Sequence, residues 1–280
     1  MEIIKTKRAI SNKVQSLRHR GFSIGLVPTM GALHEGHSSL IRKALKENNK
    51  IIVSVFVNPT QFSDPEDFLK YPRNSVKDLQ ILRDLKVDMV FMPDKEEMYP
   101  EDDHRTFDLY PLDTVMEGKY RKNHFYGVAQ IVTKLFETIT PDRAYFGQKD
   151  FQQLVIIKRL VAMMGYNIII VSCPVIRESD GLAMSSRNML LSDEERKIAP
   201  FIAQTLFRAR EMKNELSPGD LTCWVYDQFT AHKEFQLEYF EIVDELELRK
   251  IEDWSDPVSK IGCIAVRLGK VRLIDNIIFN

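Results

Sequence analysis

Two histidines three positions apart, His34 and His37, lie in the glycine-containing segment PTMGALHEGH at residues 28–37. Glycines let a backbone approach a ligand closely, and the free N–H groups at a helix start favour phosphate. Two imidazoles there can donate hydrogen bonds to phosphoryl oxygens and stabilise charge on an oxygen as it leaves. The segment therefore predicts a phosphate site. A metal site and an incidental surface pair are the alternatives, although Glu35 and the spacing do not match the HExxH zinc motif.

Two further clusters carry groups that suit a small polar substrate and a nucleotide. The segment FVNPTQF offers the neutral amides of Asn58 and Gln61, which suit hydroxyl or carboxylate groups. The segment YFGQKDFQQ offers Lys149 as a point charge for phosphate and Asp150 as an acceptor for ribose hydroxyls. An ordinary Asn-Pro turn and a helix cap beside a surface lysine are the alternative interpretations.

A fourth cluster, RESDGLAMSSRN at 177–188, places two hydroxyls and an arginine on a glycine-containing loop. This composition is typical of an anion clamp that holds triphosphate charge while a bond to it breaks, although a plain loop could have it too. All four clusters follow predicted strands, and ligands of open parallel sheets bind beyond the carboxyl ends of the strands. The four clusters together predict an α/β enzyme that handles a nucleoside triphosphate beside a small polar substrate.

Alternating strands and helices must position these clusters. Short β-branched runs predict strands, and apolar residues spaced along one face predict helices. The predicted strands are 23–27, 51–57, 89–92, 143–146 and 167–171, and the predicted helices are 38–48, 75–85, 128–138 and 151–164. The first two strands are expected to stop at a proline turn, at Pro28 and at Asn58-Pro59. This alternation predicts a Rossmann-like parallel sheet with helices on both faces.

The pattern changes after Arg177. A capping box at Ser192–Glu195 predicts a helix running to about Asn214, and Ser217-Pro218 predicts the start of another. A half-buried strand at 237–243 and a hairpin across 261–275 complete a smaller α+β unit with antiparallel strands. The predicted domains are 1–177, which would bind the nucleotide and the small substrate, and 178–280, which would cover them as a lid.

Composition narrows the class of protein. The 280 residues are 44% hydrophobic and 28% charged, which is typical of a globular protein of about two domains. The formal net charge of −1 argues against a nucleic-acid partner and an anionic membrane surface. Three scattered cysteines predict no disulfide framework, and the charged N-terminus and lack of long apolar runs predict no signal peptide or membrane span. A cytoplasmic protein is expected.

Six segments, in order along nearly the whole chain, carry a family resemblance. They are PTMGALHEGH (28–37), FVNPTQF (56–62), HFYGVAQIVTKLF (124–136), YFGQKDFQQL (145–154), IRESDGLAMSSRN (176–188) and RLIDN (272–276). This set resembles the pantoate–β-alanine ligase (pantothenate synthetase) family. HEGH and MSSRN also resemble the HIGH and KMSKS signatures of the wider nucleotidylyltransferase superfamily, and Glu117 and Arg121, ahead of His124, match the family's EG…R..HF pattern.

The resemblance implies an ATP-dependent, AMP-forming acid–amino-acid ligase. The carboxylate of (R)-pantoate would attack the α-phosphorus of ATP to give pantoyl adenylate and pyrophosphate. The amine of β-alanine would then displace AMP to form the amide of pantothenate. A homodimer and Mg²⁺ bound with ATP are also implied. No protein ligand set for a metal is spelled out, so the ion is expected to bind mainly through phosphate and water.

The resemblance also implies roles for individual residues. His37 would be the proton donor, and the other implied catalytic residues are His34, Lys149 and Arg187. The implied ATP-binding residues are Met30, Gly31, Ala32, Leu33, His34, Glu35, Gly36, His37, Gly147, Gln148, Lys149, Asp150, Ile176, Met184, Ser185, Ser186 and Arg187. Pantoate would be held by Gln61 and Gln153, and β-alanine by Gln61 and Asn58.

Three other functions compete with this interpretation. Another small-molecule nucleotidyltransferase of the same superfamily would need extra basic residues for a phosphorylated acceptor, where this chain offers Gln61 and Gln153. A tRNA-binding protein would need a basic, aromatic-bearing face, whereas residues 238–247 are acidic in places. A non-catalytic nucleotide sensor would bind ATP without turnover.

Overall fold

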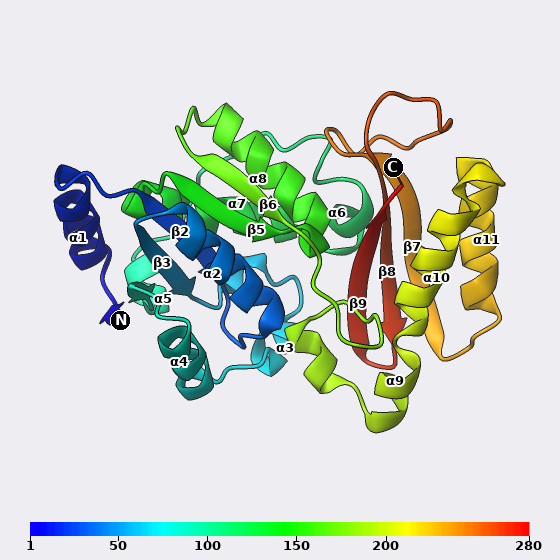
Figure 1. The fold of residues 1–280 in the computed structure, drawn as a ribbon, viewed down its shortest axis with the longest axis horizontal. Coiled ribbons are helices and arrows are strands. Elements are labelled where there is room, and N and C mark those ends of the chain that lie inside the picture. Colours follow the sequence, from blue (N-terminus) through cyan, green and yellow to red (C-terminus); the bar gives the residue numbers. More distant parts are fainter. Residues whose placement is uncertain (280) are drawn as a thin grey trace.

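The computed structural model describes residues 1–279 and contains two sheets (Figure 1). The larger sheet is parallel throughout, in the order β1-β4-β3-β2-β5-β6. Its strands are β1 (Glu2–Ile4), β2 (Ile24–Thr29), β3 (Lys50–Val55), β4 (Met89–Phe91), β5 (Arg143–Gly147) and β6 (Ile169–Cys173). The helices around it are α1 (Lys7–His19), α2 (Glu35–Glu47), α3 (Pro65–Lys70), α4 (Ser75–Asp84), α5 (Lys95–Met98), α6 (Met116–Tyr120), α7 (His124–Ile139) and α8 (Phe151–Met163).

Helices cover both faces of this sheet because alternate strand residues point to opposite sides. In β3, Ile52 faces a core built with α1, α7 and α8, whereas Ile51 and Val53 face a core built with α2 and α4. All three side chains are fully buried. The predicted Rossmann-like layer arrangement is confirmed.

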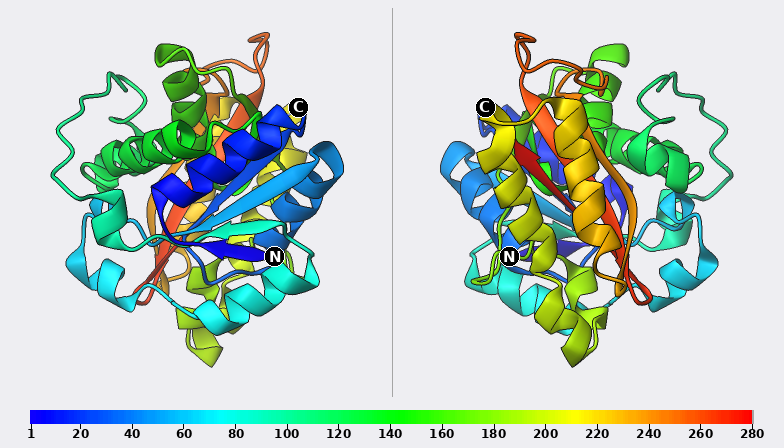
Figure 2. Two further views of the ribbon diagram at one scale, coloured as in Figure 1. Left: turned by 90° about the vertical axis from the view of Figure 1, so that its left-hand side faces the viewer. Right: turned by 90° about the vertical axis from the view of Figure 1, so that its right-hand side faces the viewer.

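The rest of the chain forms a three-stranded antiparallel sheet in the order β7-β8-β9. Its elements are α9 (Asp193–Ile198), α10 (Phe201–Glu211), α11 (Pro218–Thr230), β7 (Phe235–Asp244), β8 (Lys260–Leu268) and β9 (Val271–Ile278). Figure 2 (right) shows α10 and α11 lying over one face of this sheet. The predicted α+β unit is confirmed.

The two sheets share buried surface. Phe240 and Ile264 of the small sheet pack into a core with α10 and α11, whereas Tyr239, Cys263 and Ala265 point the other way into the core that holds α7 and α8. The small sheet is therefore buried on both faces. A domain boundary between residues 177 and 178 stays a prediction.

Some element boundaries differ from those predicted. Strand β2 continues through Pro28 instead of stopping before it, because its pairing with β5 involves only Gly25 and Leu26, upstream of the proline. The helix predicted from Ser192 to about Asn214 is broken at Pro200, which cannot donate the backbone hydrogen bond that a continuous helix requires. The capping box at Ser192 is confirmed.

The sequence analysis did not predict the edge strand β1 or the helix α1. Helix α1 buries Ile10, Val14 and Leu17, and Thr6 caps it by accepting a hydrogen bond from the amide of Ala9 at 3.3 Å. This spacing of four and three residues is an ordinary helical signal, so the helix could have been predicted from the sequence.

Candidate active site

One pocket lies at the carboxyl ends of β2, β3 and β5, where the four sequence clusters come together. It also reaches the segment that follows β6 and, near Met184, the loop at residues 177–188, which we call the clamp loop. The site residues predicted from the sequence that line this pocket are Met30, His34, Gly36, His37, Asn58, Gln61, Gly147, Lys149, Asp150, Gln153, Ile176, Met184, Ser185, Ser186 and Arg187. Residues far apart in the sequence, from Met30 to Arg187, thus line the same pocket.

Five predicted ATP-binding residues do not line this pocket: Gly31, Ala32, Leu33, Glu35 and Gln148. The amides of Ala32 and Leu33 donate to the buried carboxylate of Asp78 at 3.0 and 2.7 Å, so these two donors are already used within the protein. Glu35 forms an ion pair with Arg42. Contact of these five residues with ATP stays a prediction.

The two histidines cap the first turn of α2. His34 Nδ1 accepts a hydrogen bond from the amide of Gly36 at 3.1 Å, and His37 Nδ1 accepts one from the amide of His34 at 3.3 Å. Since each Nδ1 accepts, the proton of each neutral ring lies on Nε2. Both rings therefore carry an Nε2–H donor. Helix α2 begins at Glu35, three residues before the predicted start, because His34 caps it.

Burial keeps both imidazoles neutral. Desolvation, followed by the charge of Lys149, lowers the pKa of His34 to about 4. Desolvation, followed by the charges of His34 and Lys149, lowers the pKa of His37 to about 3. In the free pocket both rings are therefore neutral at neutral pH, and each Nε2–H is able to donate a hydrogen bond to an anion. The role of His37 as proton donor stays a prediction.

Two of the pocket-lining residues, Lys149 and Arg187, carry positive charge. Lys149 follows β5, and its ammonium lies 3.8 Å from the carboxylate of Asp150. Its backbone carbonyl accepts a hydrogen bond from the side-chain amide of Asn276 at 3.0 Å, which ties this turn to β9. Across the pocket, Arg187 donates to Asp67 of α3 at 2.8 Å.

The clamp loop is anchored to the small sheet. Arg177 donates two hydrogen bonds to the carboxylate of Asp275, at 2.6 and 3.0 Å, and a third to the carbonyl of Gly181 at 3.1 Å. Asp275 is 3% exposed, so this ion pair is largely shielded from water. The RLIDN segment therefore supplies the anchor of the clamp loop through its aspartate.

Sequence reasoning missed Asp67 and Tyr71, which reach the clamp from α3 and its C-terminal cap. Tyr71 lines the pocket, and its hydroxyl lies 3.3 Å from that of Ser186. Both residues stand more than a hundred positions from their clamp partners, and no spacing rule connects segments so far apart.

A buried polar chain joins the small sheet to the backbone of Gln61, which lines the pocket. Glu117 in α6 accepts hydrogen bonds from Arg272 of β9 at 2.6 and 2.7 Å, and it lies 3.7 Å from Arg121. Arg121 donates to His124 Nε2 at 3.0 Å, and His124 Nδ1 donates to the carbonyl of Gln61 at 2.7 Å. This chain of contacts, which starts at the small sheet, thereby holds the carbonyl of Gln61 in place.

Gly127 lets α7 approach closely to the turn at residues 58–61. A Cβ atom at this position would overlap the carbonyl group of Thr60 and the amide nitrogen of Gln61. We expect Gly127→Ala to push this turn aside, to raise several-fold the KM for the acid substrate that the resemblance implies, and to lower stability by about 1–3 kcal/mol. Steady-state kinetics and thermal unfolding would measure both effects.

The matched control is Gly219→Ala in α11, where the nearest atom to a new Cβ would be 3.8 Å away. This variant should keep the wild-type KM. An unchanged pantoate KM in Gly127→Ala would contradict the role given to this close packing.

Fold and pocket together define a class: a nucleotide-binding α/β ligase or transferase with an HxGH loop and a phosphate clamp. A family model described as Pantoate-beta-alanine ligase matches residues 2–278. A pantothenate synthetase of Porphyromonas gingivalis is 51% identical, and the match covers 99% of each chain. The chain therefore belongs to the pantoate–β-alanine ligase family.

Solved structures agree with this assignment. The pantothenate synthetase of Thermus thermophilus is 39% identical, with a TM-score of 0.92 and 99% of each chain covered. A pantoate-beta-alanine ligase from Francisella tularensis, complexed with beta-gamma ATP and beta-alanine, is 36% identical with a TM-score of 0.83, covering 100% of this chain and 98% of its own. The predicted family, fold class and pantothenate-forming ligase activity are confirmed. Among residues 1–279, no helix is both long and apolar enough to cross a membrane.

Proposed function

We propose that the chain makes pantothenate from ATP, (R)-pantoate and β-alanine in this one pocket, through a pantoyl adenylate. The observation that carries the proposal is the meeting of the HxGH imidazoles, the amides of Gln61 and Gln153 and the 185–187 clamp around a common space. The imidazoles and the clamp would supply donors for phosphate, and the neutral amides would hold a small polar acid.

In the first step, a carboxylate oxygen of pantoate would bond to the α-phosphorus as the bond to the β-phosphate oxygen breaks, releasing pyrophosphate. The Nε2–H groups of His34 and His37 would donate to phosphate oxygens and stabilise the charge that grows on the leaving oxygen. Lys149 would add positive charge at the same side. Gln61 and Gln153 would hold pantoate in line with the phosphorus.

Arg187 would join the triphosphate by exchanging its partner. It now donates to Asp67, whose side chain is 35% exposed, so the pair is not sealed from solvent. A triphosphate carries more negative charge than one carboxylate and offers the guanidinium a bidentate site. Arg187, Ser185 and Ser186 would then complete the phosphate clamp.

In the second step, the neutral amine of β-alanine would attack the acyl carbon of the adenylate. The new C–N bond forms, the acyl C–O bond to AMP breaks, and the amine gives up a proton to solvent. Adenylation makes this step feasible because AMP is a much better leaving group than oxide. Gln61 is proposed to contact β-alanine as well as pantoate, with Asn58 beside it.

Mg²⁺ is proposed to bind as part of the ATP complex. Among residues 1–279, no group of three or more His, Cys, Asp or Glu side chains is arranged to hold a metal ion. The proposed ligands of the ion are phosphate oxygens and water, as is usual for Mg²⁺. When bound, the ion would neutralise part of the triphosphate charge.

A homodimer and a cytoplasmic location complete the proposal, both on the family resemblance. The sheet edge β6 supports a partner surface, because Ile169 is 57% exposed there and the adjoining Ile170 and Val171 are only partly buried.

Exchange of labelled pyrophosphate into ATP tests the proposed intermediate. We expect exchange to require pantoate and to proceed without β-alanine, because the adenylate forms before the amine enters. Addition of β-alanine should then release AMP in an amount equal to the pantothenate formed. Exchange that is equally fast without pantoate, or that appears only when β-alanine is present, would overturn the adenylate mechanism.

A further inference from the structure

The amide of Asn58 has its hydrogen-bonding positions filled by protein groups. Its Oδ1 accepts from the hydroxyls of Tyr99 at 2.8 Å and Thr60 at 3.2 Å. Its Nδ2 donates to the carbonyl of Gly127 at 2.9 Å and to Oε1 of Gln61 at 3.3 Å. The residue is 1% exposed, so water offers no substitute for any of these partners.

These contacts fix which way each amide faces. The carbonyl of Gly127 can only accept, so the NH₂ end of Asn58 must face it, and the oxygen end must face Tyr99. Since Asn58 then donates to Oε1 of Gln61, the NH₂ group of Gln61 is the end left for the pocket. That NH₂ group now lies 2.9 Å from Sδ of Met30, a weak acceptor that a substrate oxygen would replace.

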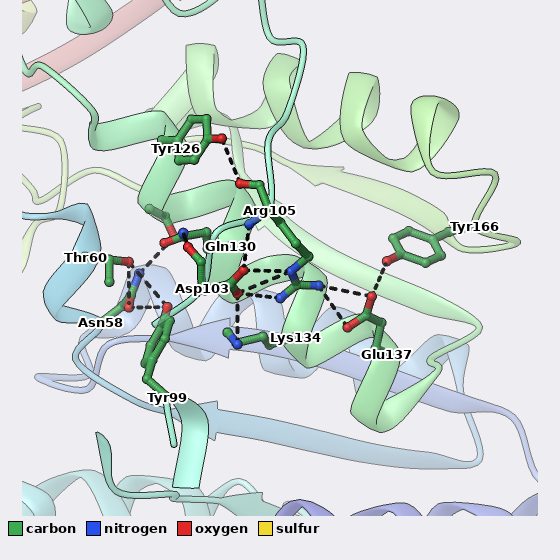
Figure 3. Close-up of polar contacts among 11 residues, drawn as sticks. Asn58, Thr60, Tyr99, Asp103, Arg105, Tyr126, Gln130, Lys134, Glu137 and Tyr166 are labelled. Carbon is green, nitrogen blue, oxygen red and sulfur yellow. Dashed lines mark hydrogen bonds and ion pairs between the residues drawn. The ribbon is translucent and has the colours of Figure 1, made fainter. Parts of the chain in front are cut away.

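Tyr99 is held firmly in the position from which it donates. It follows α5, and its amide donates to the carbonyl of Lys95 at 2.8 Å. The ammonium of Lys134 lies 4.8 Å from the centre of its ring, and Asp103 holds that ammonium at 2.9 Å. Figure 3 shows Tyr99 and Thr60 beside Asn58, with the Asp103–Lys134 pair to the right of the Tyr99 ring.

The phenol stays protonated through the range in which the enzyme would work. Burial raises the pKa of Tyr99 above its ordinary value of 10.0. Its hydroxyl is therefore a constant donor, and Asn58 meets a fixed partner on that side.

We propose that Tyr99 is a positioning residue for the acid substrate: its hydroxyl fixes the amide of Asn58, and through it turns the NH₂ group of Gln61 toward an acceptor oxygen of that substrate. This inference rests on the proposed role of Gln61 in pantoate binding. Tyr99 does not line the pocket, and its hydroxyl contacts Asn58 at 2.8 Å and the hydroxyl of Thr60 at 3.3 Å.

The test is Tyr99→Phe, which removes the hydroxyl and keeps the ring. Because Oδ1 of Asn58 then keeps only the longer hydrogen bond from Thr60, at 3.2 Å, both amides are held less tightly, and we expect kcat/KM for pantoate to fall about tenfold. The KM for ATP should change less than twofold. The matched control is Tyr126→Phe, whose hydroxyl donates to the carbonyl of Arg105 at 2.7 Å in the same region but does not reach Asn58 (Figure 3). This control should keep kcat/KM for pantoate within twofold of wild type.

A double-mutant cycle separates positioning from general disturbance of the fold. In a Gln61→Ala background there is no amide left to turn, so adding Tyr99→Phe should cost less than twofold further in pantoate-dependent exchange. An equal tenfold loss in both backgrounds, or an unchanged pantoate kcat/KM in Tyr99→Phe alone, would overturn the inference. Wild-type exchange that needs no pantoate would instead overturn the proposed function, so the two failures are distinguishable.

Discussion

Replacing His37 by alanine is expected to lower kcat for pantoate-dependent adenylation by about a hundredfold to a thousandfold, the loss that follows removal of one buried donor to a developing anion. The ring lies on the first turn of α2 and lines the pocket, and its Nδ1 is occupied by the amide of His34. Only its Nε2–H would remain to meet the phosphates of the proposed ATP complex. Steady-state rates of pyrophosphate exchange would measure the loss, and His104→Ala, at an exposed position, is the control.

The pH dependence distinguishes a neutral donor from an acid. Desolvation, followed by the charges of His34 and Lys149, holds the pKa of His37 at about 3, below its ordinary value of 6.5. The ring of the free enzyme is thus already neutral at pH 6, and kcat/KM for ATP should not fall between pH 6 and 8 through loss of its proton. A decline that follows a single group with a pKa near 7, and that disappears in His37→Ala, would show that the residue works as an imidazolium acid.

The meeting of the four clusters could be predicted from the sequence for a simple reason. Each cluster follows a short apolar run, and the carboxyl ends of parallel strands lie at one edge of a sheet. His34, Gln61 and Lys149 accordingly line one pocket. Local periodicity was enough to predict that these three segments share one sheet edge.

The contacts that hold these groups in place could not be predicted in the same way. Asp78 accepts hydrogen bonds from the amides of Ala32 and Leu33, which lie 46 and 45 positions away in the sequence. Asp67 accepts one from Arg187, which lies 120 positions away. Such pairs depend on the paths of loops in space, which no local pattern encodes. Tyr99 lies in the polar stretch that follows the predicted strand 89–92, and none of the motifs found in the sequence includes it.

The buried ion network around Glu117, which links α6 to β9, should be a large contributor to stability. Glu117 is 6% exposed and pairs with Arg272, whose side chain is 14% exposed. It also accepts a hydrogen bond from the hydroxyl of Tyr239 at 2.8 Å. Removing one partner of such a pair leaves the other charge buried and poorly compensated, which typically costs about 3–5 kcal/mol.

Urea unfolding of Glu117→Ala is therefore expected to show a free energy of unfolding about 3–5 kcal/mol below wild type at pH 7. Burial opposes ionisation of this carboxyl, but the hydrogen bonds and charge of Arg272 outweigh it and hold the pKa at about 2, below the ordinary 4.5. Since the folded pKa is depressed, the stabilisation is complete above about pH 5 and is lost as the pH falls toward 2. The difference between wild type and variant should shrink over that window.

Glu137→Ala, which breaks a half-exposed pair with Arg105, is the matched control and should cost less than about 1 kcal/mol. A Glu117→Ala deficit no larger than that of the control, or one that does not change with pH, would mean that the network is not what holds the small sheet against α6.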